Sequence, residues 1–243
     1  MKRVGAIVLA CLLAGPAFAK GGSAMHFEPD LSNRQSLLRG ARTFVNYCLS
    51  CHSAAFMRYN RLGLDLGIPE DVLKANLMFG TDKPGETMTV AMNPADAERW
   101  FGVAPPDLSV TARARGADWL YTYFMTFYRD PARPTGVNNL AFKDVAMPHV
   151  LWELQGWQRP VYQETGEGAQ SGKVIDHLEL ESPGLQNEEQ YEATVRDLVN
   201  FLVYLGEPIK LKRHTIGLWV ILYLVILLGI VYLLKREYWS DVH

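Results

Sequence analysis

The strongest constraint on the fold is an apolar run near the carboxyl end of the chain. Residues 216–234 carry no charged side chain and are rich in Leu, Ile and Val. At about 1.5 Å per residue, a helix over this run covers close to 30 Å, the thickness of one hydrocarbon core. A buried helix of a soluble protein is normally apolar on one face, whereas this run is apolar on every face. The sequence therefore predicts a single transmembrane helix at residues 215–234.

The amino-terminal residues have the pattern of a cleavable secretory signal. Lys2 and Arg3 precede an apolar run that is too short to span a bilayer, and the small residues Ala17 and Ala19 follow it. A lipoprotein signal ending at Cys11 is the minor alternative. We expect cleavage after Ala19.

These two segments predict the organisation of the chain. It comprises a signal peptide at 1–19, an exported domain at 20–214, an anchor at 215–234 and a short cytoplasmic tail at 235–243. Basic residues flank both ends of the anchor and slightly oppose this orientation, but a signal that carries a long domain usually dominates. The formal charge is −2. Cleavage would remove Lys2 and Arg3 and no acid, leaving −4, so nucleic acid is not an expected partner.

The exported domain holds one motif that carries chemistry, Cys48-Leu49-Ser50-Cys51-His52. Two cysteines separated by two residues could form a redox disulfide or half of a zinc site. A zinc site needs a second ligand pair that this chain lacks, and a thioredoxin-like dithiol needs a βαβ context. With His52 directly following, the motif is the attachment pattern of a c-type haem. Cys48 and Cys51 would form thioethers to the haem, and His52 would ligate the iron.

Two amphipathic helices are predicted at the ends of the domain. Ser32 to Gln35 fit a capping box, and apolar residues at helical spacing follow as far as the motif. A second helix begins after Asn187 and ends at Gly206. This arrangement resembles the class I cytochrome c fold, in which the first and last helices cross. Gly40 and Phe44 would then contact Phe201 or Tyr204. The predicted fold class is mainly α, a class I cytochrome c-like haem domain with insertions, plus one carboxyl-terminal transmembrane helix.

The second iron ligand is expected to be a methionine. Met147 lies late in the domain, and Pro148 biases it toward an extended conformation that suits a ligand. His149 is the main alternative, which would give two histidine ligands. The other methionines after the motif lie too close to His52, in an aromatic run or in an irregular middle segment. They are Met57, Met78, Met88, Met92 and Met125.

Four stretches together resemble the cytochrome c1 family, the haem subunits of the cytochrome bc1 complex. They are residues 48–52, residues 104–109 continuing to 113–115, residues 134–137, and Met147-Pro148. The single anchor after Gly206-Glu207-Pro208 also matches. The resemblance implies one covalent haem c, with His52 and Met147 as iron ligands. It also implies that Arg115 pairs with a haem propionate, with Arg113 as its substitute.

The resemblance implies further contacts and partners. Pro106 would form a wall beside the haem, and Trp119 stands where an aromatic residue near the propionate is commonly Tyr. The implied function is electron transfer from a Rieske iron-sulfur protein to a soluble periplasmic c-type cytochrome. Cytochrome b would handle quinol in a dimeric complex of the inner membrane. A membrane-tethered electron shuttle, a terminal oxidase subunit and a haem-based sensor are the alternatives.

Acidic side chains between Asp65 and Glu86 and the segment at 157–190 are the remaining features of the domain. Five acidic residues could steer a basic partner: Asp65, Glu70, Asp71, Asp82 and Glu86. Residues 157–190 are rich in Gly, Glu and Gln and predict a turn at 165–168 between two short extended stretches, with no chemistry assigned.

Overall fold

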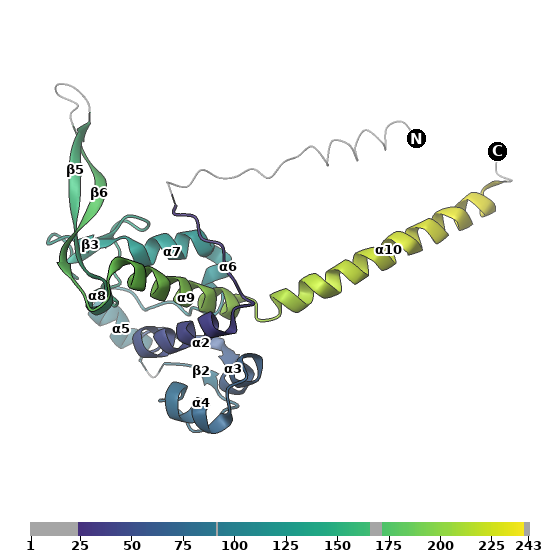
Figure 1. The fold of residues 1–243 in the computed structure, drawn as a ribbon, viewed down its shortest axis with the longest axis horizontal. Helices are drawn as coiled ribbons and strands as arrows, with labels where there is room; N and C mark the ends of the chain where they lie inside the picture. The colour runs from purple at the N-terminus through teal and green to yellow at the C-terminus, as the bar shows by residue number, and fades with distance from the viewer. Residues whose placement is uncertain (1–23, 91, 166–171, 241–243) are drawn as a thin grey trace.

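The computed structural model describes residues 24–90, 92–165 and 172–240, so the predicted signal peptide and the end of the predicted tail lie outside the described residues. Helices predominate, as Figure 1 shows. In chain order the elements are α2 (Arg34–Thr43), η1 (Phe44–Cys48), β1 (Ala54–Arg58), α3 (Tyr59–Leu66), α4 (Glu70–Leu77), β2 (Thr87–Met88), α5 (Pro94–Phe101), α6 (Thr111–Arg115), α7 (Ala117–Met125), β3 (Phe127–Arg129), β4 (Val137–Asn139), α8 (Trp152–Gln155), β5 (Gly156–Thr165), β6 (Gly172–Pro183), α9 (Glu188–Gly206) and α10 (Lys210–Tyr238).

The first predicted helix is present, but its cap differs by one residue from the prediction. Asn33 is the N-cap, and its side chain accepts a hydrogen bond from the Ser36 backbone N–H at 3.0 Å. Ser32 was expected in that position, but its hydroxyl donates instead to the Asp30 carboxylate at 2.6 Å. The capping box at residues 32–35 is therefore wrong, because the side chain of Ser32 is already engaged upstream of the helix.

The second predicted helix, α9, begins and ends where the sequence indicated. The Asn187 side chain accepts from the Gln190 backbone N–H at 2.9 Å, and the Gln190 side chain accepts from the Asn187 N–H at 3.1 Å. This reciprocal pair satisfies two N–H groups that the first turn of a helix leaves without partners.

Helices α2 and α9 cross in contact at Gly40, as the resemblance to class I cytochromes c implied. A Cβ atom on Gly40 would lie 2.1 Å from the Asp197 carbonyl oxygen, so only glycine allows this approach. Next to the crossing, the rings of Phe44 and Phe201 pack with centroids 5.5 Å apart. The Asp197 carboxylate accepts two hydrogen bonds from Arg39, at 2.5 and 3.0 Å. Apolar packing and a bidentate ion pair thus fix the two helices.

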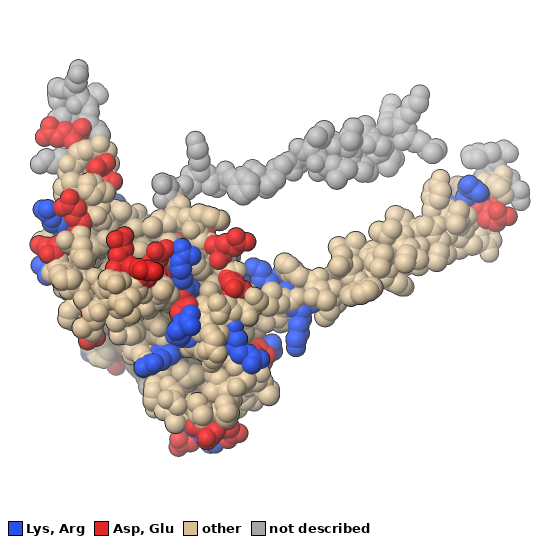
Figure 2. Space-filling view, in the orientation of Figure 1, with Lys and Arg blue, Asp and Glu red and all other residues tan. Residues whose placement is uncertain are grey.

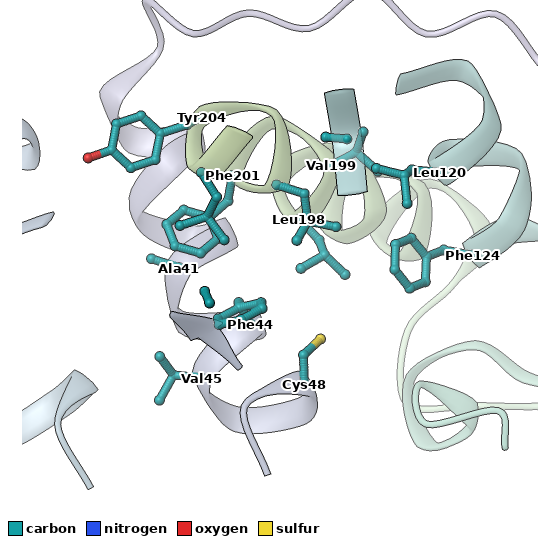
Figure 3. Packing of buried hydrophobic residues seen from close by; sticks show 14 of the residues in the cluster. Ala41, Phe44, Val45, Cys48, Leu120, Phe124, Leu198, Val199, Phe201 and Tyr204 are labelled. Carbon is teal, nitrogen blue, oxygen red and sulfur yellow. The ribbon is translucent and has the colours of Figure 1, made fainter. Parts of the chain in front are cut away.

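The core extends from this crossing to α7. Figure 3 shows Phe44 and Cys48 on one side of α9, with Leu120 and Phe124 of α7 packed nearby. Tyr191 of α9 is almost fully buried, and its hydroxyl donates to the Phe124 carbonyl at 2.8 Å. Helix α6 also contacts α9, and the short antiparallel pair β3–β4 follows α7. Helices α2, α7 and α9 therefore form one packed unit.

The segment at 157–190 contains a long antiparallel hairpin that stands away from the helices (Figure 1). Its strands, β5 and β6, pair from Gly156↔Pro183 to Thr165↔Gly172. The prediction of two extended stretches is confirmed, but they are longer than the short stretches expected. Residues 166–171, which include most of the predicted turn, lie outside the described residues.

Helix α10 contains the predicted membrane span and extends away from the domain (Figure 1). Among the residues that the structure describes, it is the helix long and apolar enough to cross a membrane, and no residue of its apolar stretch is buried. Figure 2 shows almost no charged side chain along its middle. A helix of a water-exposed surface would be polar on at least one face, so this helix is a candidate membrane anchor.

We expect Gly40→Ala to destabilise the protein, because the new methyl group would collide with the backbone of α9. Overpacking of this kind typically lowers the free energy of unfolding by about 1–3 kcal/mol. Thermal unfolding of the detergent-solubilised full chain measures the effect. Gly80→Ala is the matched control, because a Cβ at Gly80 would meet nothing within 4 Å. Equal midpoints for the two variants would contradict the role of Gly40.

Candidate cofactor site

The Cys48–His52 segment forms a tight turn at the end of η1, the short helix that follows α2. Residues Phe44–Cys48 form a π-helical turn, η1, of a kind often found at functional sites. The Cys48 carbonyl then accepts hydrogen bonds from the N–H groups of Cys51 at 3.0 Å and His52 at 2.8 Å. Both sulfur atoms and the imidazole are thereby held within one turn of chain.

No disulfide joins Cys48 and Cys51. Cys48 is buried, and this burial, with a smaller contribution from Cys51, raises the pKa of its thiol to about 12. A redox-active dithiol needs the opposite, a cysteine with a lowered pKa that reacts as a thiolate. Neither influence on Cys48 lowers its pKa, so Cys48 lacks the activated thiolate of a redox dithiol.

His52 is oriented by a hydrogen bond to Pro106. Its Nδ1 atom lies 2.7 Å from the Pro106 carbonyl oxygen. Because a carbonyl can only accept, Nδ1 carries the proton, and the lone pair is on Nε2. Burial lowers the pKa of His52 and so favours the neutral ring. The hydrogen bond to Pro106 and the charge of Asp107 act in the opposite direction but are weaker. Such a bond to the far nitrogen is the usual way in which a metal-ligating histidine is held.

All seven residues predicted to bind the cofactor line one cavity of about 330 Å³. They are Cys48, Cys51, His52, Pro106, Arg115, Trp119 and Met147. Many of its other lining residues are apolar or aromatic, among them Phe101, Val103, Leu108, Leu120, Phe124, Phe142, Val145, Val150 and Leu202. The volume falls in the range of roughly 300–1,000 Å³ that is typical of small-molecule and cofactor sites.

The structure separates the two candidates for the second iron ligand. Met147 lines the cavity, whereas His149 does not. His149 is buried behind it, with its ring stacked on Phe127 at a centroid distance of 4.9 Å. Burial lowers the pKa of His149 to about 4. The other methionines considered above lie outside the cavity lining as well. This placement favours Met147.

Arg115 lies at the rim of the cavity. Its guanidinium carbon is 5.0 Å from the Trp119 ring centroid and 5.8 Å from that of Phe142. These cation–π contacts hold the charge at the cavity although the residue is exposed. A propionate paired with Arg115 would therefore sit at the solvent-facing rim rather than buried. Arg113, the alternative, packs along Gly206 of α9 and does not line the cavity.

Tyr123 is the main site residue that the sequence analysis missed. It lines the cavity, is 7% exposed, and its hydroxyl lies 3.3 Å from the Met147 sulfur. It follows Trp119 by four residues on α7, so the two side chains share one face of the helix and stack at 4.9 Å. This i,i+4 spacing was the available signal, but the sequence analysis singled out only Trp119 of the two.

Two buried asparagines fasten the loop that carries Met147. The Asn139 amide donates to the Tyr123 carbonyl at 2.7 Å, and its oxygen accepts from the N–H groups of Ala141 and Phe142 at 2.8 and 3.1 Å. The Asn138 side-chain oxygen accepts from the Asp144 N–H at 2.8 Å. The loop is thereby tied to α7 before it reaches Met147.

The acidic residues expected to steer a partner do not border the cavity. Asp65 accepts hydrogen bonds from Arg61 at 2.5 Å and from the Tyr204 hydroxyl at 2.9 Å, so its carboxylate is occupied within the domain. Glu70 pairs with Lys74 at 2.6 Å, and Glu86 lies 3.8 Å from Lys83. Figure 2 shows acidic side chains at the lower tip of the domain, where α4 lies in Figure 1. Steering of a basic partner by these five residues stays a prediction.

The donor atoms of the cavity fit a covalently attached haem. Two cysteine sulfurs with no disulfide between them, a histidine whose Nε2 is available and a thioether sulfur line a cavity whose other walls are largely apolar. Thiols suit attachment to the porphyrin edge, and a His/Met pair suits a haem iron.

Comparison with known proteins agrees with this fit. The Cytochrome C1 family model matches residues 29–242. The chain belongs to the cytochrome c1 family. It is 49% identical to cytochrome c1 of Allochromatium vinosum over 96% of both chains. It is also 48% identical, over the full length of both chains, to a Nitrosomonas europaea protein named ammonia monooxygenase gamma subunit. Cytochrome c1 of Rhodospirillum rubrum is 26% identical over 96% of this chain and 97% of that protein.

Family membership establishes the cofactor and the general function of the chain. As a cytochrome c1 family protein, the chain carries one covalently attached haem c, and the predicted cofactor is confirmed. Membership of this family also supports a role in electron transport through the haem iron. The exposed apolar helix α10 agrees with a membrane-anchored protein of this family.

Proposed function

We propose that this chain is the one-electron carrier of a cytochrome bc1 complex. It takes electrons from the Rieske iron-sulfur protein and passes them to a soluble periplasmic c-type cytochrome, and so contributes to quinol oxidation coupled to proton translocation. The observation that carries the proposal is the meeting of Cys48, Cys51, His52 and Met147 at one cavity. These four residues come from two segments far apart in the sequence.

Each of the four residues has a distinct role in this proposal. Cys48 and Cys51 form the two thioether bonds, His52 offers Nε2 to the iron, and Met147 offers its sulfur as the second ligand. When bound, the haem supplies an iron that gains and loses one electron. The Pro106 carbonyl keeps the His52 ring in one orientation and one tautomer.

The cavity walls set the environment of the electron carrier. Apolar side chains such as Val145, Val150 and Leu202 line the cavity, and they would keep water away from the ligand side chains. A site with little water needs little rearrangement when its charge changes by one. At the rim, Arg115 supplies a permanent cation for a propionate, with Trp119 packed beneath the guanidinium.

The proposed placement in the cell follows from the two ends of the chain. Residues 1–19 are removed on export, residues 20–214 lie in the periplasm, and residues 215–234 cross the inner membrane. The tail at 235–243 is then cytoplasmic. Helix α10 would pack beside cytochrome b in a dimeric complex, because its exposed apolar surface needs lipid or protein around it.

Met147→Leu should lower the reduction potential and open the iron to carbon monoxide in the ferrous form. Loss of the sulfur removes the ligand that, paired with histidine, raises the potential. Redox titration and a carbon monoxide difference spectrum of the solubilised chain measure both effects. Met125→Leu is the matched control, because Met125 is half-buried outside the cavity. An unchanged spectrum and potential in Met147→Leu would contradict the ligand assignment.

Affinity purification through a tag on this chain tests the assembly. We expect b-type haem to co-purify, with inhibitor-sensitive, quinol-dependent reduction of cytochrome c. A c-type signal without b-type haem or that activity would overturn the proposal and indicate a tethered shuttle. Carbon monoxide binding by the unmodified protein would instead favour a sensor.

A further inference from the structure

The hydroxyl group of Tyr123 is placed against the sulfur of Met147. The two atoms are 3.3 Å apart, and the structure gives this hydroxyl no other hydrogen-bond partner among the described residues. A thioether sulfur has no proton to give, so the hydroxyl must be the donor. A phenol has an ordinary pKa of about 10, so this hydroxyl keeps its proton at neutral pH.

Aromatic contacts and the backbone fix the ring that carries this hydroxyl. Tyr123 stacks on Trp119 at 4.9 Å and meets Phe127 edge to face at 5.0 Å. Its carbonyl accepts the hydrogen bond from Asn139, whose side chain also holds the start of the Met147 loop. The donor and the acceptor are therefore positioned by the same network, and the hydroxyl cannot turn away without disrupting the packing.

We propose that Tyr123 is a positioning residue that holds the Met147 sulfur and raises the reduction potential of the site. This inference rests on the proposed function, in which Met147 is an iron ligand. A thioether sulfur has two lone pairs, so one can accept from Tyr123 while the other faces the metal. A sulfur that accepts a hydrogen bond donates less electron density to a cation. Compared with a sulfur that accepts no hydrogen bond, it therefore stabilises the more positively charged, oxidised iron less, and the reduction potential is higher.

The test compares Tyr123→Phe with Tyr121→Phe in the detergent-solubilised full chain. Both changes delete one hydroxyl from α7, but the Tyr121 hydroxyl donates to Glu192 at 2.8 Å and lies outside the cavity lining. We expect Tyr123→Phe to shift the redox equilibrium two- to tenfold toward the oxidised form. At about 59 mV per tenfold for one electron, that lowers the potential by roughly 18–59 mV.

A second readout tests the positioning role. The ferric form of Tyr123→Phe should bind added imidazole severalfold faster than the unmodified protein, because the sulfur it must displace is held less firmly. Tyr121→Phe should match the unmodified protein in both measurements. If Tyr123→Phe does not fold with its haem, fluorotyrosine introduced at position 123 provides the opposite change. Its more acidic hydroxyl is a stronger donor, so the potential should rise.

The outcomes separate this inference from the proposed function. If removal of the Tyr123 hydroxyl leaves potential and imidazole binding unchanged while Met147→Leu alters both, the role of Tyr123 is overturned and the ligand assignment stands. If Met147→Leu is also silent, both are overturned. A fluorotyrosine variant with an unchanged or lowered potential would likewise contradict the role of Tyr123.

Discussion

The close approach of α2 and α9 at Gly40 is the contact on which the rest of the site depends. Without a side chain at Gly40, the backbone of α2 reaches the Asp197 carbonyl, and Phe44 packs on Phe201 one turn later. That packing fixes where α2 ends, and η1 turns the chain immediately afterwards into Cys48–His52. The position of both thiols and of His52 is thus a consequence of a helix crossing more than two turns away.

The other side of the cavity is built differently, from polar contacts rather than from helix packing. Met147 belongs to a loop, and a loop side chain can hold a fixed position only if its backbone is tied down. Asn138 and Asn139 provide those ties, and the stack of the half-buried Trp119 on the buried Tyr123 forms part of the cavity wall. The Cys48–His52 segment and the Met147 loop therefore meet at one cavity, and each is positioned by its own local interactions.

The sequence predicted best what depends on spacing along the chain. A local sequence pattern is compatible with few structures in three cases. These are the Cys48–His52 motif, the two terminal helices and the apolar anchor. Pro148 pointed to Met147 for a similarly local reason. Three contacts join residues far apart in the chain, and no local pattern indicates them. They are the hydrogen bonds from Asn139 to the Tyr123 carbonyl, from the Tyr123 hydroxyl to Met147 and from the Tyr204 hydroxyl to Asp65. The misplaced cap at Ser32 failed because Ser32 and Asn33 are both good capping residues, and the contact with Asp30 decided between them.

The most direct test of the central claim is the mass of the peptide that contains residues 48–52. The purified chain would be denatured, treated with an alkylating reagent and digested, and that peptide would be weighed. The account predicts a peptide that carries one haem, with neither Cys48 nor Cys51 alkylated, because both sulfur atoms are in thioether bonds. A haem-free peptide, with two alkylated thiols or with an internal disulfide, would contradict it.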